Sequence, residues 1–213
     1  DTDRSRGLGD VYKRQTLPEL IGRFGAELLG KANYARFGQE FPLLVKFIDA
    51  REDLSIQVHP DDELARKRHG KSGKCEMWYV LEAEPGASLL TGFSRPIAPA
   101  EYERRVADNT LTDVLNRQAI ASGDVFYLPA GRVHSIGKGS FIVEIQQSSD
   151  ITYRIYDFDR RDAAGNSREL HTELAREAID FESSENSRIT YAPENNQEVR
   201  LVTTPYFTTS LYT

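Results

Sequence analysis

Two polar side chains, Gln57 and His59, stand two residues apart in the run SIQVHP at 55–60. The apolar residues Ile56 and Val58 alternate with them, which is typical of a β-strand. Gln57 and His59 would therefore project from the same face of a sheet and could converge on one point. A bound metal ion would offset the cost of burying such a polar pair. By itself, this motif also fits a hydrogen-bonded histidine in the core or at its rim.

The segment GDVFYLPAGRVH at 123–134 holds a second candidate, His134. A Gly-Asp turn leads into an apolar strand, a Pro-x-Gly turn redirects the chain, and His134 stands at the head of the next strand. This Gly-x5-Pro-x-Gly-x2-His spacing resembles the second motif of the cupin superfamily, small jelly-roll barrels whose interior holds a metal. Lys138 stands where those proteins usually have asparagine. The alternative is a chance turn beside a surface histidine.

Glu76 opens an aromatic-rich strand in the segment GKCEMWYV at 73–80. A carboxylate at the head of a buried strand needs a partner. Zinc binds nitrogen and oxygen ligands, and a catalytic zinc site keeps one position open for water or substrate. A centre made of two imidazoles, a carboxylate and an unusual amide oxygen would use His59, His134, Glu76 and Gln57.

The elements that must position these residues are short and mostly β. A helical pattern with a capping Thr16 and a closing Gly30 spans 17–29. Apolar runs rich in β-branched and aromatic residues predict strands at 43–48, 55–58, 77–81, 88–90, 125–128 and 141–146. Further helices are expected at 99–115 and 170–178, and two β runs broken at Pro205 are expected at 198–212. Repeated short strands with Gly/Pro turns predict a mainly β fold, a cupin-type jelly-roll barrel with added helices.

Three segments are expected along the chain. Residues 1–15 are polar and lack an apolar period, so we interpret them as a disordered or non-native leader. Residues 16–190 would form a zinc-binding cupin domain with helical insertions. Residues 191–213 would be the start of a truncated second jelly roll, because a lone hairpin is only marginally stable in water.

Composition narrows the class of protein. The 213 residues carry a net charge of −6, with no basic footprint for nucleic acid and no polybasic stretch for an anionic membrane. Apolar runs in the sequence are too short to span a bilayer. The single cysteine, Cys75, excludes an internal disulfide framework, so a cytoplasmic setting is expected.

Taken in order, the motifs resemble type I mannose-6-phosphate isomerases of the short bacterial form. The resemblance rests on FPLLVKFIDA, LSIQVHP, GKCEMWY, PAGRVHSIG and QQSSDITYRIYDFDR, and runs from about residue 16 to the end of the chain. It also accounts for two departures from ordinary cupins. Gln57 replaces the first histidine of a His-x-His pair, and sixteen residues separate His59 from Glu76. Parts of the family pattern look absent, so the chain is expected to be a fragment.

The resemblance implies an enzyme that interconverts mannose 6-phosphate and fructose 6-phosphate with one zinc ion per chain. Its metal ligands would be Gln57, His59, Glu76 and His134. Arg154 and Lys74 would be the catalytic residues and would also bind substrate, and Arg160 would bind the phosphate. Moving a proton between C1 and C2 through an enediol(ate) needs a base and a group that stabilises oxyanion charge. The identity of the base stays open.

Two other functions remain open. A cupin Fe(II) oxygenase could also use two histidines and one carboxylate, although Gln57 argues against it. A sugar-binding or sensing cupin without catalysis would keep the metal ligands but would not need Arg154 and Lys74. Both of these residues are present, which favours the isomerase.

Overall fold

The computed structural model describes residues 15–182 and 186–212. The chain divides into two compact units, residues 1–43 and 44–213. The leader predicted at 1–15 lies outside the described residues except for its last position.

Three short helices form the described part of the first unit: α1 (Leu17–Phe24), α2 (Ala26–Leu29) and α3 (Lys31–Phe37). Thr16 caps α1 as predicted. Its hydroxyl accepts a hydrogen bond from the Glu19 amide, and the Glu19 carboxylate accepts one from the Thr16 amide at 2.6 Å. The single helix predicted over 17–29 is wrong, because Gly25 adopts a φ of +47° and separates α1 from α2.

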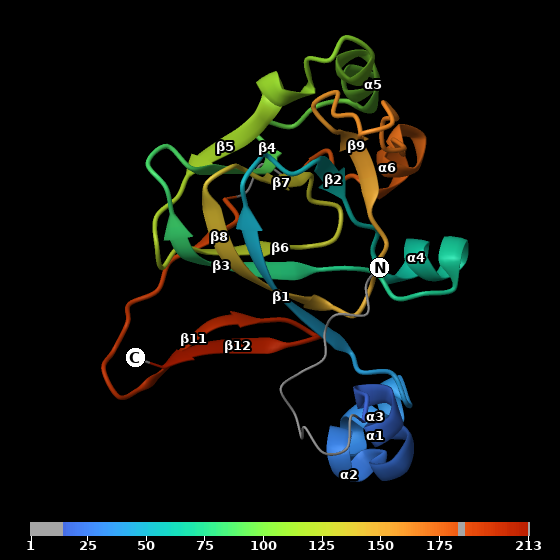
Figure 1. The fold of residues 1–213 in the computed structure, drawn as a ribbon, viewed down its shortest axis with the longest axis vertical. Coiled ribbons are helices and arrows are strands. Elements are labelled where there is room, and N and C mark those ends of the chain that lie inside the picture. Colours follow the sequence, from blue (N-terminus) through green and yellow to red (C-terminus); the bar gives the residue numbers. More distant parts are fainter. Residues whose placement is uncertain (1–14, 183–185, 213) are drawn as a thin grey trace. The chain divides into compact units, whose positions relative to one another are not determined.

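Two five-stranded sheets dominate the second unit and lie face to face (Figure 1). The first sheet has the order β1 (Leu43–Ala50), β8 (Ser140–Gln147), β3 (Glu76–Ala83), β6 (Val125–Leu128), β10 (Arg188–Ile189). The second has the order β5 (Leu115–Ala119), β4 (Ser88–Phe93), β7 (His134–Ile136), β2 (Ile56–Val58), β9 (Tyr153–Tyr156). In the first sheet β8, β3, β6 and β10 pair antiparallel, and in the second sheet all five strands do. The prediction of a mainly β, jelly-roll-like architecture with added helices is confirmed.

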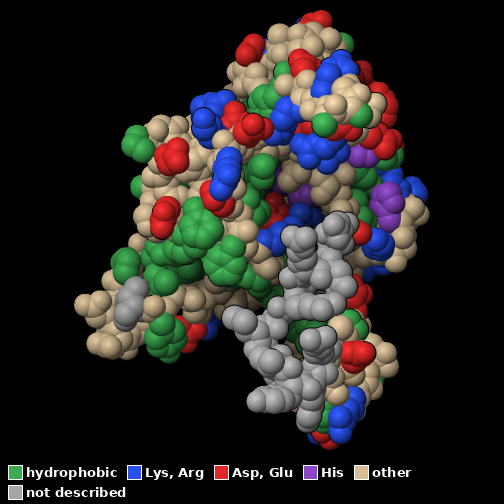
Figure 2. All heavy atoms as spheres, viewed as in Figure 1, with side chains coloured by type: hydrophobic (Ala, Val, Ile, Leu, Met, Phe, Trp, Pro, Cys, Tyr) green, Lys and Arg blue, Asp and Glu red, His purple; other side chains and the backbone are tan. Residues whose placement is uncertain are grey.

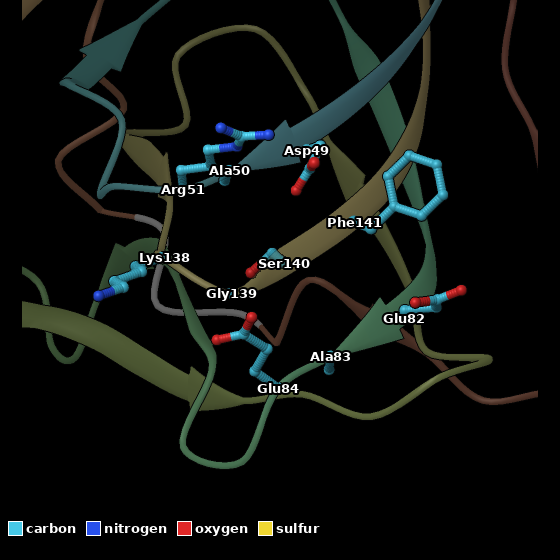
Figure 3. Close-up of a pocket in the computed structure, with 10 residues that line it drawn as sticks. All are labelled: Asp49, Ala50, Arg51, Glu82, Ala83, Glu84, Lys138, Gly139, Ser140 and Phe141. Atoms are coloured by element: carbon cyan, nitrogen blue, oxygen red, sulfur yellow. The ribbon is translucent and has the colours of Figure 1, made fainter.

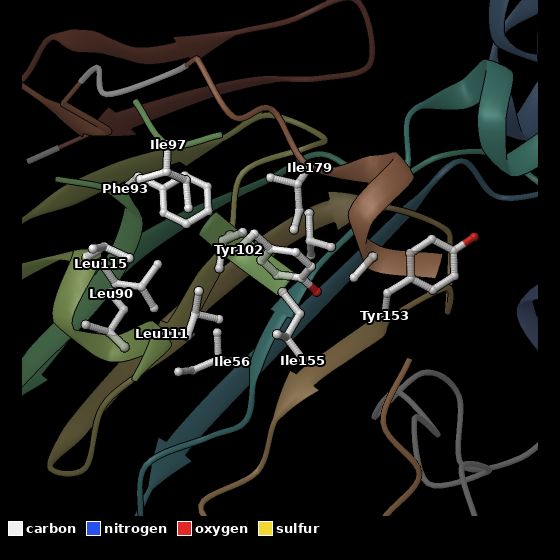
Figure 4. Close-up of a cluster of buried hydrophobic side chains, with 14 of the residues drawn as sticks. Ile56, Leu90, Phe93, Ile97, Tyr102, Leu111, Leu115, Tyr153, Ile155 and Ile179 are labelled. Atoms are coloured by element: carbon white, nitrogen blue, oxygen red, sulfur yellow. The ribbon is translucent and has the colours of Figure 1, made fainter. Parts of the chain in front are cut away.

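Two hydrophobic clusters cover the second sheet on both faces. One cluster lies between the sheets and includes Trp78 and Phe126 from the first sheet and Leu89 from the second. The other lies on the opposite face of the second sheet and takes in Ile56 and Val58 of β2 (Figure 4). Helices contribute to this second cluster, namely α4 (Asp62–His69), α5 (Pro99–Ala107) and α6 (Thr172–Ala178). Because Ile56 and Val58 face the helices, the residue between them faces the space between the sheets.

Most predicted strands are present within a few residues of their expected bounds. The hairpin expected at 198–212 consists of β11 (Glu198–Thr203) and β12 (Thr208–Tyr212), which form a separate two-stranded sheet. Whether this hairpin begins a second jelly roll stays a prediction. The helix predicted over 99–115 ends early, since α5 stops at Ala107 and Asn109 takes a φ of +56°. A 3-10 turn (Leu111–Val114) and β5 follow, and β5 was missed because its sequence, LNRQA, is mostly polar.

The described helices include none that is both long and apolar enough to cross a membrane. Hydrophobic side chains do gather on part of the surface (Figure 2), and on β1 Val45 and Phe47 are 52% and 69% exposed.

Replacing Val80 by alanine should lower the free energy of unfolding by about 2–3 kcal/mol, because its fully buried side chain lies between the sheets and its removal leaves a cavity. Val45→Ala, on β1 of the same sheet, is the matched control. It should cost less than about 1 kcal/mol, since that side chain already faces solvent. Denaturant titrations followed by Trp78 fluorescence would measure both, and equal losses would contradict this description of the core.

Candidate metal centre

Three buried side chains that can bind metal, His59, Glu76 and His134, meet between the two sheets. Gln57 of β2 is the register partner of His134 of β7, so these two side chains lie on the same face of the second sheet. Glu76 is the first residue of β3 in the opposite sheet, and His59 directly follows β2. One ligand atom from each of His59, Glu76 and His134 lies within 4.8 Å of the others.

Both histidines are oriented by backbone carbonyls. His59 Nδ1 lies 2.8 Å from the carbonyl oxygen of Ile151, and His134 Nδ1 lies 2.8 Å from that of Arg132. A carbonyl oxygen can only accept, so each Nδ1 carries the proton and each Nε2 presents a lone pair. These Nε2 atoms point at Glu76, at 3.7 Å for His59 and 3.1 Å for His134.

The protonation states match those of metal ligands. Burial would raise the pKa of Glu76, but the positive charge of Lys74 beside it holds this pKa well below its usual value. Burial lowers the pKa of His59 well below its usual value, and the nearby positive charge of Lys74 acts in the same direction. The centre therefore presents an ionised carboxylate beside neutral imidazole, the forms that bind metal ions.

Several polar atoms at the centre lack hydrogen bonds. Within the part of the chain that the structure describes, His59 Nε2 and both carboxylate oxygens of Glu76 have no well-aligned hydrogen-bond partner. Glu76 is fully buried, and leaving a buried carboxylate without hydrogen bonds is costly. A cation among these atoms would relieve that cost.

Gln57 and Lys74 complete the immediate surroundings. The Gln57 amide nitrogen lies 3.3 Å from His134 Nε2, so this side chain reaches the same point as the three buried ligands. Lys74 Nζ lies 3.1 Å from Glu76 Oε2, and its side chain is only 5% exposed. The structure thus brings together five of the seven residues proposed from the sequence.

Arg154 lies on the same face of the second sheet as Gln57, because the two residues are register partners on β9 and β2. Its Nη1 donates a hydrogen bond of 2.9 Å to the carbonyl of Glu169. Burial lowers the pKa of Arg154, as does the positive charge of Arg168 close by. Arg154 therefore leaves the sheet on the same face as Gln57, and both Arg168 and Asp157 lie near its guanidinium.

Arg160 is held elsewhere. It donates to Asp157 Oδ1 at 2.5 Å and to the backbone carbonyl of Asp53 at 2.6 Å. Arg168 also donates to the Asp157 carboxylate. None of the hydrogen bonds that the structure describes for Arg160 reaches any of the four candidate metal ligands, Gln57, His59, Glu76 and His134.

Sequence reasoning missed a polar group on the first sheet. Lys46 Nζ lies 2.8 Å from Glu144 Oε1 and 2.6 Å from Gln146 Oε1, and Trp78 Nε1 donates to Glu144 Oε2 at 3.1 Å. Gln146 is the register partner of Glu76, so this group borders the metal-binding cluster. The signal was present in β8, where Glu144 and Gln146 alternate with apolar residues in the same way as Gln57 and His59.

A cavity of about 370 Å³ opens at the other end of the first sheet (Figure 3). It is lined by side chains that include Asp49, Glu84 and Lys138, and by none of the residues proposed from the sequence. The ends of β3 and β8 that border this cavity are opposite to those that carry Glu76 and Gln146. The candidate metal centre is therefore distinct from it.

Comparison with known proteins gives a consistent result. Residues 6–93 match the family "Phosphomannose isomerase type I, catalytic domain". The chain is 39% identical over 199 residues to mannose-6-phosphate isomerase of Streptococcus mutans, a match that covers 93% of this chain and 61% of that protein. It is 41% identical over 174 residues to mannose-6-phosphate isomerase ManA of Bacillus subtilis, covering 81% of this chain and 53% of that protein.

Solved structures extend the comparison to the fold. The crystal structure of mannose 6-phosphate isomerase from Bacillus subtilis is similar with a TM-score of 0.82 and 34% identity, over 93% of this chain and 62% of that one. The chain thus spans between 53% and 62% of the length of these relatives. By sequence and by fold, the chain is similar to the type I phosphomannose isomerases, as its motifs predicted.

Proposed function

We propose that this chain is the metal-binding part of a zinc-dependent isomerase that interconverts mannose 6-phosphate and fructose 6-phosphate. The observation that carries the proposal is the convergence of three buried ligand atoms that have no well-aligned hydrogen-bond partner among the described residues. The names of the two relatives supply the substrate, since both are mannose-6-phosphate isomerases. A cytoplasmic setting is part of the same proposal.

Zinc fits the donor set. Ligand atoms about 2.0–2.2 Å from a tetrahedral zinc lie roughly 3.4 Å from one another, and Glu76 lies 3.1 Å from His134 Nε2 and 3.7 Å from His59 Nε2. Gln57 would supply the fourth ligand through its amide oxygen. Bound zinc would act as a Lewis acid on a carbonyl or hydroxyl oxygen of the sugar.

Arg154 and Lys74 would stabilise the developing negative charge and transfer the proton, respectively. Arg154 is always charged, so its guanidinium would stabilise the enediolate oxygens as negative charge develops. Lys74 is a candidate to hold or move the proton, because its ammonium is buried beside Glu76. Lys46 and Glu144 form a further ion pair next to these residues.

Arg160 is proposed to bind the phosphate by charge-assisted hydrogen bonds together with Arg154. Its present contacts with Asp157 mean that a phosphate group would compete with a carboxylate for this guanidinium. The substrate would therefore have to displace part of an existing ion pair or share it.

The 213-residue chain should bind close to one zinc ion, and His134→Ala should lose most of this binding because one imidazole ligand is removed. At a free zinc concentration about 100 times the dissociation constant, the parent chain should gain roughly 2.7 kcal/mol of stability. Elemental analysis and thermal unfolding with and without zinc would measure both effects.

His69→Ala is the control for this experiment. It removes the same side chain from α4, where the imidazole bonds to the Tyr153 hydroxyl at 2.8 Å instead. Equal zinc uptake by the two variants would refute the proposed centre. A marked preference for Fe(II) over zinc would instead favour an oxygenase, since two histidines and one carboxylate also suit that metal.

Arg154→Met should lower kcat for the interconversion of the two sugar phosphates by roughly 100- to 1000-fold, because charge stabilisation in the transition state is lost. Arg161→Met removes an exposed arginine that donates to the Gly165 carbonyl, and should leave kcat unchanged. In D₂O the product should carry deuterium from solvent at C2 or C1. Unchanged turnover in Arg154→Met would remove its assigned role.

If the parent chain binds both zinc and the sugar phosphate but shows no turnover, the result would favour a sensing protein.

A further inference from the structure

The loop that carries Lys74 is attached by hydrogen bonds to the first residue of α4, Asp62, and to Pro60. The Gly73 amide donates a hydrogen bond of 2.8 Å to Asp62 Oδ1. The next amide, that of Lys74, donates to the carbonyl of Pro60 at 3.1 Å. The amides of Gly73 and Lys74 are therefore both hydrogen-bonded to the segment that follows His59.

Gly73 fits this contact only because it lacks a side chain. A Cβ atom at this position would lie 2.4 Å from the Asp61 carbonyl carbon and 2.5 Å from the Asp62 nitrogen. Both are backbone atoms and cannot move aside without shifting the start of α4. The loop and the helix are thus in direct backbone contact.

Gln147 extends the same connection beyond Lys74. Its Nε2 donates to Asp62 Oδ1 at 3.2 Å, and its Oε1 accepts from the Cys75 amide at 2.9 Å. Gln147 is buried at the end of β8. Asp62 therefore acts directly on Gly73 and, through Gln147, on Cys75, the two residues that flank Lys74.

The hairpin of β11 and β12 supplies the remaining contact. The Tyr206 hydroxyl donates to Asp62 Oδ2 at 3.1 Å. Tyr206 lies in the turn between the two strands, where its amide and that of Phe207 both donate to Thr204 Oγ1 at 3.0 Å. Phe207 is buried, so the turn that presents Tyr206 is itself fixed.

The charge state of Asp62 is consistent with this role. Burial would raise its pKa, but hydrogen bonds from Gly73, Gln147 and Tyr206 and the charge of Arg66 together lower it. The carboxylate is ionised and can accept all three hydrogen bonds at once.

We propose that Asp62 and Tyr206 are positioning residues: they fix the Lys74 loop against α4, so that the β11–β12 hairpin takes part in the geometry of the candidate site. The catalytic consequence rests on the proposed isomerase function. The structural consequence, an ordered loop at residues 73–75, does not depend on it.

Hydrogen–deuterium exchange of the Gly73 and Cys75 amides tests the structural part. Tyr206→Phe and Asp62→Ala should speed exchange at these amides, by about threefold and about tenfold respectively, because hydrogen bonds that order the loop are lost. Asp62→Asn should recover much of the protection, since its amide oxygen still accepts from Gly73. Tyr191→Phe is the matched control, because that hydroxyl donates to the Gly123 carbonyl instead. Exchange as slow in Tyr206→Phe and Asp62→Ala as in Tyr191→Phe would overturn the proposal.

Turnover and zinc affinity test the catalytic part in the same variants. Asp62→Ala should lower kcat about tenfold while zinc affinity and KM change little, and Asp62→Asn should restore most of the loss. Faster exchange with unchanged kcat would overturn the positioning role. If the parent chain lacks turnover altogether, the proposed function fails, and the exchange measurements alone decide whether Asp62 and Tyr206 order the loop at residues 73–75.

Discussion

The buried carboxylate of Glu76 is the group on which the arrangement of the centre depends. Moving an ionised carboxylate out of water costs several kcal/mol unless other groups compensate. Lys74 supplies one positive charge at 3.1 Å, yet the lone pairs of His59 and His134 point at the same carboxylate. Electron-rich atoms this close repel one another, and an ion pair with Lys74 leaves that repulsion in place. A cation among the three ligands removes the conflict, which is why the geometry supports a metal centre more than a structural salt bridge.

The scaffold achieves this convergence by burying the second sheet on both faces. Alternation along β2 sends Ile56 and Val58 into the cluster under the helices and leaves Gln57 to face the first sheet. By covering one face of β2, the helices therefore help to orient the candidate ligands. None of the four candidate ligands lies on a helix. On the opposite sheet, β3 begins at Glu76, and its neighbour β8 contributes Gln146 beside it. Each sheet thus presents one polar patch to the other inside an otherwise apolar interior.

Local alternation and turn chemistry predicted which faces the candidate ligands lie on, while contacts between distant segments were beyond such local patterns. The period-two pattern of SIQVHP predicted that Gln57 and His59 share one face of a strand, and the Pro-x-Gly turn predicted that a strand starts at His134. Lys46 and Glu144 were missed because they are 98 positions apart in the sequence, and a local pattern does not show that the strands carrying them are neighbours. The ion pair of Arg160 with Asp157 is local, since the two residues are three positions apart, and a salt-bridged surface was the alternative to a phosphate site for these residues. The break at Gly25 could not be predicted from the pattern either, because the helical spacing of apolar residues continues from α1 into α2.

Strand β1 forms one edge of the first sheet. Proteins commonly protect such edges with an outward lysine or a proline, because exposed peptide groups beside apolar side chains recruit further strands. Here the lysine of β1 is turned toward Glu144, and Val45 and Phe47 face solvent instead. The arrangement that brings a positive charge to the candidate site thus leaves the edge open to aggregation when this chain is handled alone at high concentration.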